Sequence, residues 1–404
     1  MILARGILSI FSRNPYTMKF LRYSFLTLLV LYFLFTLIAP GIVEAGKNEV
    51  LLAGPYMASK QATALVQDMD FIGDLHCDAL LWDRKLYKKK DYGHVDFPRM
   101  REGNVAFQAF TIVTKSPQGQ NMEKNSADAM DMITLLSIGQ GQWPTTWFSL
   151  MRRALYQCDK LHAHAARSDD KVLVIKDKAS LEELLADRRS GRKTIGGMLG
   201  VEGGHCLEGK LENLGQLYDA GVRMLGPTHF FDNELGGSAH GLTHGGLSDF
   251  GRQVVAEMDQ RDMIIDVAHA SEAMVDDILA LYEGPILSSH TGVDGTYPSP
   301  RNLSDKHLSA IAAKGGLIGI AYFPGAVGAD GIPDIVRAMT YTKNLIGVEH
   351  VALGSDFDGS VTTPFDTRGL PLLVDEMYAQ GYADSEIKAI LGDNLRRFLL
   401  EHLK

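Results

Sequence analysis

The feature that most constrains the fold is a repeated alternation of short apolar runs with segments of helical periodicity. Eight runs predict β-strands, and they are apolar throughout, which is typical of a parallel sheet covered on both faces. The expected strands cover residues 70–75, 105–113, 195–201, 223–227, 263–268, 286–289, 317–321 and 351–354. The expected helices between them cover residues 211–220, 251–260, 271–281, 306–314, 334–345 and 370–380.

Strands that alternate with helices indicate parallel βα units, and eight such units favour a (β/α)8 TIM-type barrel. An open doubly wound sheet is the alternative. The chain has 404 residues, which is longer than a minimal barrel requires. We assign part of the excess to an insertion over residues 115–167, with helical patterns at 128–137 and 148–166, and expect it to pack over the barrel mouth.

Metal-ligand residues lie at the ends of several of these apolar runs. In the stretch from Asp74 to Asp78, His76 and Asp78 are two residues apart, so on an extended segment both side chains point to the same face. Taken singly, a histidine such as His76 could be an ordinary core or surface residue. Together, at the carboxyl ends of parallel strands, they predict a metal site on the C-terminal face of a barrel. The other residues of this kind are Glu202, His269, His290 and Asp356.

The N-terminus has the composition of a membrane-targeting segment. Residues 23–38 form an uncharged apolar run that extends to residue 43, and Arg5, Arg13, Lys19 and Arg22 precede it. Basic residues before an apolar segment hold that end in the cytoplasm and send the remainder across. We divide the chain into a basic segment (1–22), a signal-anchor or signal peptide (23–43), a linker (44–67) and the barrel domain (68–404). An uncleaved membrane anchor is favoured because the run is long for a signal peptide; cleavage near residues 43–45, giving a secreted or periplasmic protein, is the alternative.

Composition excludes some partners and some cross-links. A formal net charge of −9 argues against a nucleic-acid-binding surface, and 46% hydrophobic residues suffice for a large core. Three cysteines are too few for a disulfide framework. Cys77 points away from its ligand-type neighbours on a strand, which favours a small buried apolar role. Pairing of Cys206 with another cysteine stays open.

Several sequence motifs, in this order, resemble the membrane dipeptidase (renal dipeptidase) family of zinc metallopeptidases over residues 68–400. The loop over residues 232–241 is similar to that of bacterial members, so the substrate range of mammalian members does not carry over. The motifs are DLHCDAL, HVDFPRMREGNVAFQAF, GVEGGHCLEG, GPTHFFDNELGGSAHG, GLSDFGRQVV, IDVAHAS, SSHTG, RNLSD and LGSDFDG.

The resemblance implies a barrel of the metal-dependent hydrolase kind with two zinc ions per chain. His76 and Asp78 would hold one ion, His269 and His290 the other, and Glu202 would bridge them. Nitrogen and oxygen ligands suit catalytic zinc with an open position. Two such ions share a water and convert it to hydroxide near neutral pH.

The resemblance also assigns roles in amide hydrolysis and substrate binding. Asp356 is the implied general acid/base, and Asp358 is the second choice, with structural support as its expected role. His229 would stabilise the developing oxyanion, and Arg301 would bind the carboxylate of the dipeptide. All three of His229, Arg301 and Asp356 are expected to contact substrate. His205 and Asp74 are candidates for orienting ligands.

The function implied is that of a membrane-tethered enzyme that hydrolyses the peptide bond of small dipeptides, with its catalytic domain outside the cytoplasm. Three alternatives stay open: another binuclear hydrolase acting on lactams, lactones or N-acyl amino acids (or a deaminase), a non-catalytic binding protein on the same barrel, and a purely structural tethered protein. A homodimer also stays open, although the cysteines of the mammalian disulfide-linked dimer are absent.

Overall fold

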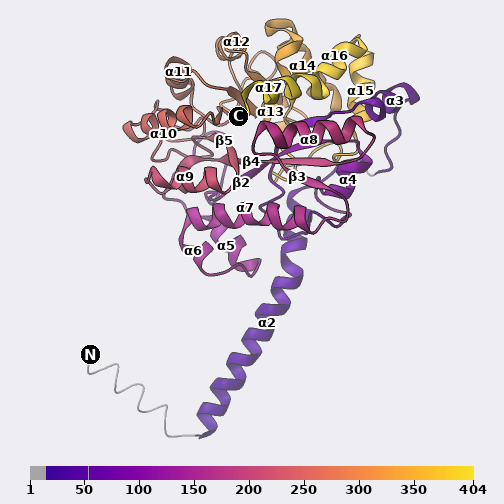
Figure 1. The fold of residues 1–404 in the computed structure, drawn as a ribbon. Coiled ribbons are helices and arrows are strands. Elements are labelled where there is room, and N and C mark those ends of the chain that lie inside the picture. The colour runs from indigo at the N-terminus through magenta and orange to yellow at the C-terminus, as the bar shows by residue number, and fades with distance from the viewer. Residues whose placement is uncertain (1–14, 53) are drawn as a thin grey trace.

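A closed ring of eight parallel strands forms the centre of the molecule (Figure 1), in a computed structural model that describes residues 15–52 and 54–404. Neighbours in the ring follow the chain order, and β2 pairs with β4 along its whole length. The ring consists of β1 (Gly73–Cys77), β2 (Phe107–Val113), β4 (Ile195–Glu202), β5 (Val222–Gly226), β6 (Ile264–Asp266), β7 (Ile286–Thr291), β8 (Leu317–Ile320) and β9 (Val351–Leu353). The predicted TIM-type barrel is confirmed, and the doubly wound alternative is excluded.

One strand, β3 (Val172–Val174), lies outside the ring and was not predicted. It pairs with residues 195–197 of β4, on the same edge that β5 occupies from Leu199 onward. The strand has only three residues, all half-buried. A run that short carries no periodic signal that a sequence pattern could detect.

Helices cover the outside of the ring because each buries one apolar face. In α10 (Asp249–Gln260) the buried residues Gly251, Val254, Val255 and Met258 recur at helical spacing, and the Ser248 hydroxyl caps the first turn. The other helices of the barrel are α4 (Phe97–Glu102), α8 (Lys178–Arg189), α9 (Glu212–Asp219), α11 (Glu272–Leu281), α12 (Asp305–Ala313), α13 (Pro324–Val327), α14 (Ile332–Ile346), α15 (Leu370–Ala379), α16 (Asp384–Lys388) and α17 (Asn394–His402), with short turns η1 (Gly204–Leu207), η2 (Val348–His350) and η3 (Ala389–Asp393).

The strands carry apolar residues on both faces because two separate cores surround them. Met224 and Ile264 belong to the core inside the ring, whereas their neighbours Leu225 and Ile265 belong to the core between ring and helices. This arrangement explains the unbroken apolar runs in the sequence.

The insertion after β2 contains α5 (Met132–Gly139), α6 (Thr145–Phe148) and α7 (Leu150–Ala166). Only its first loop lies at the barrel mouth, where Ser116, Gln120 and Met122 line the cavity described below. Helix α7 packs on the outside of the ring and buries Ala154, Cys158 and Leu161. The expectation that the insertion covers the mouth therefore holds for its first loop and not for its longest helix.

Before the barrel, α2 (Pro15–Lys47) projects away from the domain as a long helix (Figure 1). By length and composition its residues Met18–Lys47 can cross a membrane, and an 18-residue window within them has a mean hydropathy of 2.4. Residues 1–14, which include Arg5 and Arg13, lie outside the described part of the chain.

We expected residues 44–67 to be a linker, but several of the described residues in 44–52 and 54–67 are packed against the barrel. The Glu44 carboxylate lies 2.8 Å from Nε of Arg84, and the Leu51 N–H donates to the carbonyl of Thr363. Helix α3 (Lys60–Asp68) buries Leu65 in the outer core. The sequence of this segment has little hydrophobic periodicity, so its contacts with the barrel are visible only in the tertiary structure.

Candidate metal centre

Seven side chains that could bind metal converge at the carboxyl ends of the barrel strands. All are buried, and six of them, without His76, line one cavity of about 120 Å³. The parallel arrangement places the ends of these strands on one face, as the sequence predicts. The residues are His76 in β1, Asp78 after it, Glu202 at the end of β4, His229 after β5, His269 after β6, His290 in β7 and Asp356 after β9.

Glu202 lies at the centre of this group. Its Oε1 atom is 3.0 Å from Nε2 of His269, 3.3 Å from Nε2 of His290 and 3.7 Å from Nε2 of His76. Its Oε2 atom is 3.4 Å from Nε2 of His229. One carboxylate therefore faces four imidazole nitrogens, which is the position that a bridging ligand requires.

Asp78 and Asp356 also lie close to Nε2 of His76, the atom that Glu202 faces. The distances from His76 Nε2 are 3.6 Å to Asp78 Oδ1 and 3.9 Å to Asp356 Oδ1. Three sets of ligand atoms in the described chain lie within 4.8 Å of one another: His76–Glu202–His290, Glu202–His229–His269 and His76–Asp78–Asp356. The structure thus brings together all five predicted metal ligands, with His229 close enough to join them.

Two residues that sequence reasoning missed hold the histidines in place. The Ser289 hydroxyl lies 2.9 Å from Nδ1 of both His76 and His290, and it donates to Asp266 at 2.5 Å. Asp266 also accepts the N–H groups of Ser289 and Ala268. Because Nδ1 of each ring is engaged, Nε2 is left to face the centre. Asp266 and Ser289 are polar residues inside otherwise apolar strands, and this was the sequence signal that could have identified them.

Asp74 in the first strand and Thr111 in the second fix the position of His76 and Asp78. Asp74 accepts the N–H of His76 and that of Ser355, which precedes Asp356. The Thr111 hydroxyl donates to Asp78 at 2.6 Å. Asp74 thus orients ligand backbone, as expected.

His205, the other candidate for orienting ligands, has a different environment. Its Nε2 atom lies 3.0 Å from the Thr114 hydroxyl, and its ring packs against Phe231. Gly203 beside it has a φ of +96°, and a Cβ there would collide with the His205 ring. His205 therefore shapes the turn after Glu202 rather than bonding to a ligand.

The backbone is strained at two of the site residues. His269 and Asp356 have φ values of +63° and +60°, in the left-handed region that non-glycine residues seldom adopt. Such conformations persist only where the surrounding structure enforces them, and they gather at functional sites.

Burial keeps three of the imidazoles neutral. It lowers the pKa of His229, His269 and His290 well below the usual value. A neutral imidazole is the form that offers a lone pair to a metal ion.

The acidic residues of the site crowd one another in a buried volume. Burial above all, and then the Asp78 carboxylate, raises the pKa of Glu202. Burial raises the pKa of Asp356 to about 7, with Asp78 contributing in the same direction. Burial by itself lowers the pKa of His76, but Glu202, Asp78 and Asp356 together raise it to about 10. Positive charge at the centre would relieve this crowding.

These residues fit a metal ion. His76 Nε2 and Glu202 Oε1 are buried and have no hydrogen-bond partner among the described residues, although they face each other. Buried polar atoms without partners are rare and need a physical reason. Nitrogen and carboxylate oxygen donors in this number match zinc.

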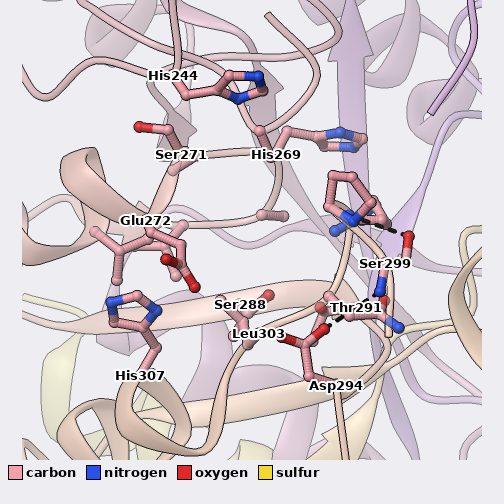
Figure 2. Close-up of a pocket in the computed structure, with 18 of the residues that line it drawn as sticks. His244, His269, Ser271, Glu272, Ser288, Thr291, Asp294, Ser299, Leu303 and His307 are labelled. Atoms are coloured by element: carbon pink, nitrogen blue, oxygen red, sulfur yellow. Dashed lines mark hydrogen bonds between the residues drawn. The ribbon is translucent and has the colours of Figure 1, made fainter. Parts of the chain in front are cut away.

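Arg301, the expected carboxylate-binding residue, lies behind the centre rather than in the small cavity. Its guanidinium is buried and donates to the backbone carbonyl of His290, while its Nε atom has no partner among the described residues. Arg301 lines a second cavity of about 420 Å³, and His269 is common to both cavities. Figure 2 shows His269 and His307 on opposite sides of this larger cavity.

Asp358 has the structural role that we expected for it. Its carboxylate forms a fully buried ion pair with Arg84 and accepts the N–H groups of His94 and Val95. Despite burial, the Arg84 and His94 contacts lower its pKa. Cys77 faces this carboxylate and not the metal centre, and all three cysteines are free.

Fold and site together define a metal-dependent hydrolase on a (β/α)8 barrel. Residues 59–402 match the family "Membrane dipeptidase (Peptidase family M19)", and the chain belongs to this family. It is therefore a metallopeptidase of the dipeptidase type, as the sequence motifs predict.

Named relatives agree with this assignment. Dipeptidase aclJ of Aspergillus oryzae is 28% identical over 353 residues, which covers 82% of this chain and 78% of the relative. A metallopeptidase from Rhodobacter sphaeroides, solved with a phosphinate mimic of the dipeptide L-Ala-D-Ala, is 25% identical with a TM-score of 0.68, covering 83% of this chain and all of that one. The metallopeptidase dipeptidase AC is also 25% identical, with a TM-score of 0.67 over 82% of this chain and 98% of that one.

Proposed function

We propose that the protein is a zinc-dependent dipeptidase that hydrolyses the peptide bond of small dipeptides. The position of Glu202 supports this proposal most directly, because its carboxylate faces the Nε2 atoms of His76, His229, His269 and His290 within 3.7 Å. A buried carboxylate is costly unless it is paired or binds a cation, and metal ions between Glu202 and these imidazoles would supply the positive charge.

Two zinc ions per chain are the proposed cofactors. His76 and Asp78 would hold one ion, His269 and His290 the other, and Glu202 would contribute to both. Zinc bound there would polarise the scissile carbonyl and lower the pKa of water. His229 is close enough to Glu202 and His269 to serve as a further ligand, and metal analysis of a His229 variant separates that role from substrate binding.

Asp356 and His229 perform the proton transfer and charge stabilisation. Asp356 lies at the rim of the ligand set and lines the cavity, so it can accept a proton from the attacking water and pass it to the leaving amine nitrogen. The His229 imidazole lines the same cavity and can donate from Nε2 to the carbonyl oxygen as it gains negative charge.

Arg301 binds the free carboxylate of the dipeptide. Its guanidinium has an unused Nε donor and lines the larger cavity, which meets the metal centre at His269. A carboxylate held there would place the adjacent peptide bond toward the centre. A guanidinium can bind a carboxylate through two parallel charge-assisted hydrogen bonds, which are strong and specific in geometry.

Helix α2 is the proposed membrane anchor, with the catalytic domain outside the cytoplasm. Lys19 and Arg22 precede its apolar run, and nearly all of that run is uncovered by protein. Glu44 lies within the expected cleavage site and Asn48 follows it; both are buried against the barrel, where Glu44 contacts Arg84 and Asn48 accepts the Ser360 N–H. Cleavage would remove the Glu44 contact, which favours the uncleaved form over a secreted one.

Activity and metal content of the full chain in detergent test the proposal. We expect close to two zinc ions per chain and hydrolysis of dipeptides in a panel that includes L,L and L,D pairs, since the Rhodobacter relative binds an L-Ala-D-Ala mimic. N-acyl amino acids and lactones in the same panel test the other binuclear hydrolase activities. A zinc-loaded chain that cleaves none of the dipeptides would refute the proposal.

A further inference from the structure

We propose that residues 132–151, named here the α5–α6 segment, enter the outer leaflet of the bilayer beside α2. The catalytic domain would then be held to the membrane by two elements instead of one. This inference rests on the proposal that α2 remains attached as a membrane span.

The composition of the α5–α6 segment differs from that of the rest of the domain. Its twenty residues contain no charged side chain, and Asp131 and Arg152 bound it. Two tryptophans, Trp143 and Trp147, lie within it. Uncharged stretches with tryptophan are typical of segments at the boundary between lipid and water.

The segment exposes apolar side chains instead of burying them. Trp143 and Phe148 are 78% and 86% exposed, and Met132 and Leu135 on α5 are exposed as well. The opposite face of α5 packs on the barrel, where Ile133 contacts a small core with Trp82 and Val113. A helix that already has its core contact does not need this second apolar face for folding.

Helix α2 is in direct contact with the segment. The Tyr32 hydroxyl donates to the carbonyl of Ile138 at 2.7 Å. A Cβ at Gly139 would lie 3.6 Å from the Phe35 ring, and a Cβ at Gly141 would lie 3.5 Å from the Thr36 methyl group. Figure 1 shows α5 and α6 at the end of the domain from which α2 projects.

The position of that contact along α2 sets the depth of the segment. From Lys19 to Tyr32 the helix rises about 20 Å, at about 1.5 Å per residue. The hydrocarbon core of a bilayer is about 30 Å thick. Arg22 is about 15 Å from Tyr32 along the helix. With the cytoplasmic boundary between Lys19 and Arg22, the end of α5 lies about 10–15 Å below the outer boundary of the hydrocarbon core, within the outer leaflet.

Lipid fits this surface better than a second copy of the chain does. The exposed apolar face continues directly onto α2, whose own surface is apolar all round and uncovered. A partner without its own membrane span cannot cover the segment at this depth, whereas lipid surrounds α2 there; contact between copies is one of the outcomes of the test below. The surface therefore belongs to the membrane-facing side of the domain.

Fluorescence of the full chain reconstituted in phosphatidylcholine vesicles tests the proposal. Phe148→Cys and Leu135→Cys are labelled with an environment-sensitive dye, and Leu281→Cys on α11 is the matched control, because Leu281 is as exposed as Leu135. The native cysteines are buried, and the unsubstituted chain gives the background labelling. We expect blue-shifted emission at positions 135 and 148 and at least about twofold more quenching by brominated lipid acyl chains than at position 281.

Several outcomes would overturn the proposal. Quenching at positions 135 and 148 that is as weak as at position 281 places the segment in water. A blue shift that depends on the protein-to-lipid ratio and resists lipid quenchers indicates contact between copies. If the measured mass of the reconstituted chain shows that the residues before Ala45 are missing, α2 is absent and the inference is refuted. Dipeptide hydrolysis by each labelled variant checks folding, and its absence in the unsubstituted chain would refute the proposed function without changing the fluorescence result.

Discussion

Ser289→Ala tests whether the candidate metal centre depends on a hydroxyl that coordinates nothing itself. The Ser289 oxygen lies 2.9 Å from Nδ1 of both His76 and His290, and its proton goes to Asp266. The hydroxyl can therefore accept an N–H from each ring. This arrangement directs Nε2 of each ring toward Glu202, where it can bind a metal ion in its neutral form.

The size of the effect follows from the buried groups that lose their partner. Each imidazole N–H left without an acceptor in a buried site costs about 1–3 kcal/mol. Removal of a group that orients metal-binding histidines lowers metal affinity by about 10- to 100-fold. We therefore expect the dissociation constant for zinc to rise by about that factor, while the barrel stays folded because its core is untouched.

The assay is a zinc competition titration against a chromophoric chelator, with thermal unfolding of the metal-loaded and metal-free chain alongside. Ser288→Ala is the matched control, because Ser288 is adjacent and equally buried, and its hydroxyl has no hydrogen-bond partner among the described residues. Equal zinc affinity in the two variants would refute the reasoning.

Three further predictions concern residues of the site. Glu202→Gln should lose bound zinc and activity together while circular dichroism stays unchanged; retention of two zinc ions in elemental analysis would contradict its bridging role. Asp356→Asn should keep both metals but lower kcat by about 10²- to 10⁴-fold. Asp358→Asn should instead lower the free energy of unfolding by about 3–5 kcal/mol, because it breaks a buried ion pair. Loss of kcat in Asp358→Asn and not in Asp356→Asn would assign the proton transfer to Asp358. Arg301→Ala should erase a tenfold or greater preference in kcat/KM for a dipeptide over its C-terminal amide, worth about 2–5 kcal/mol, and Arg301→Lys should restore only part of it; equal discrimination by the unsubstituted and Arg301→Ala enzymes would assign the carboxylate to another group.

Much of the site could be predicted because a parallel barrel turns linear order into spatial order. The ends of its strands meet on one face, so Glu202 and His290, which are far apart in the sequence, were expected to lie together, and they do. The roles of Ser289 and Asp266 could not be predicted in this way. Their hydrogen bonds cross between neighbouring strands, and the register of those strands decides which side chains meet.

The sequence by itself determined the barrel, the family and the residues that could bind metal, because apolar periodicity and ligand spacing are local properties of the chain. Only the tertiary structure decided what lies behind and around that centre. Arg301 turns toward the His290 carbonyl, Glu44 contacts Arg84 of the barrel, and α5 contacts α2 at Tyr32. Each of these contacts is made by a side chain, and its direction depends on packing that no local pattern records.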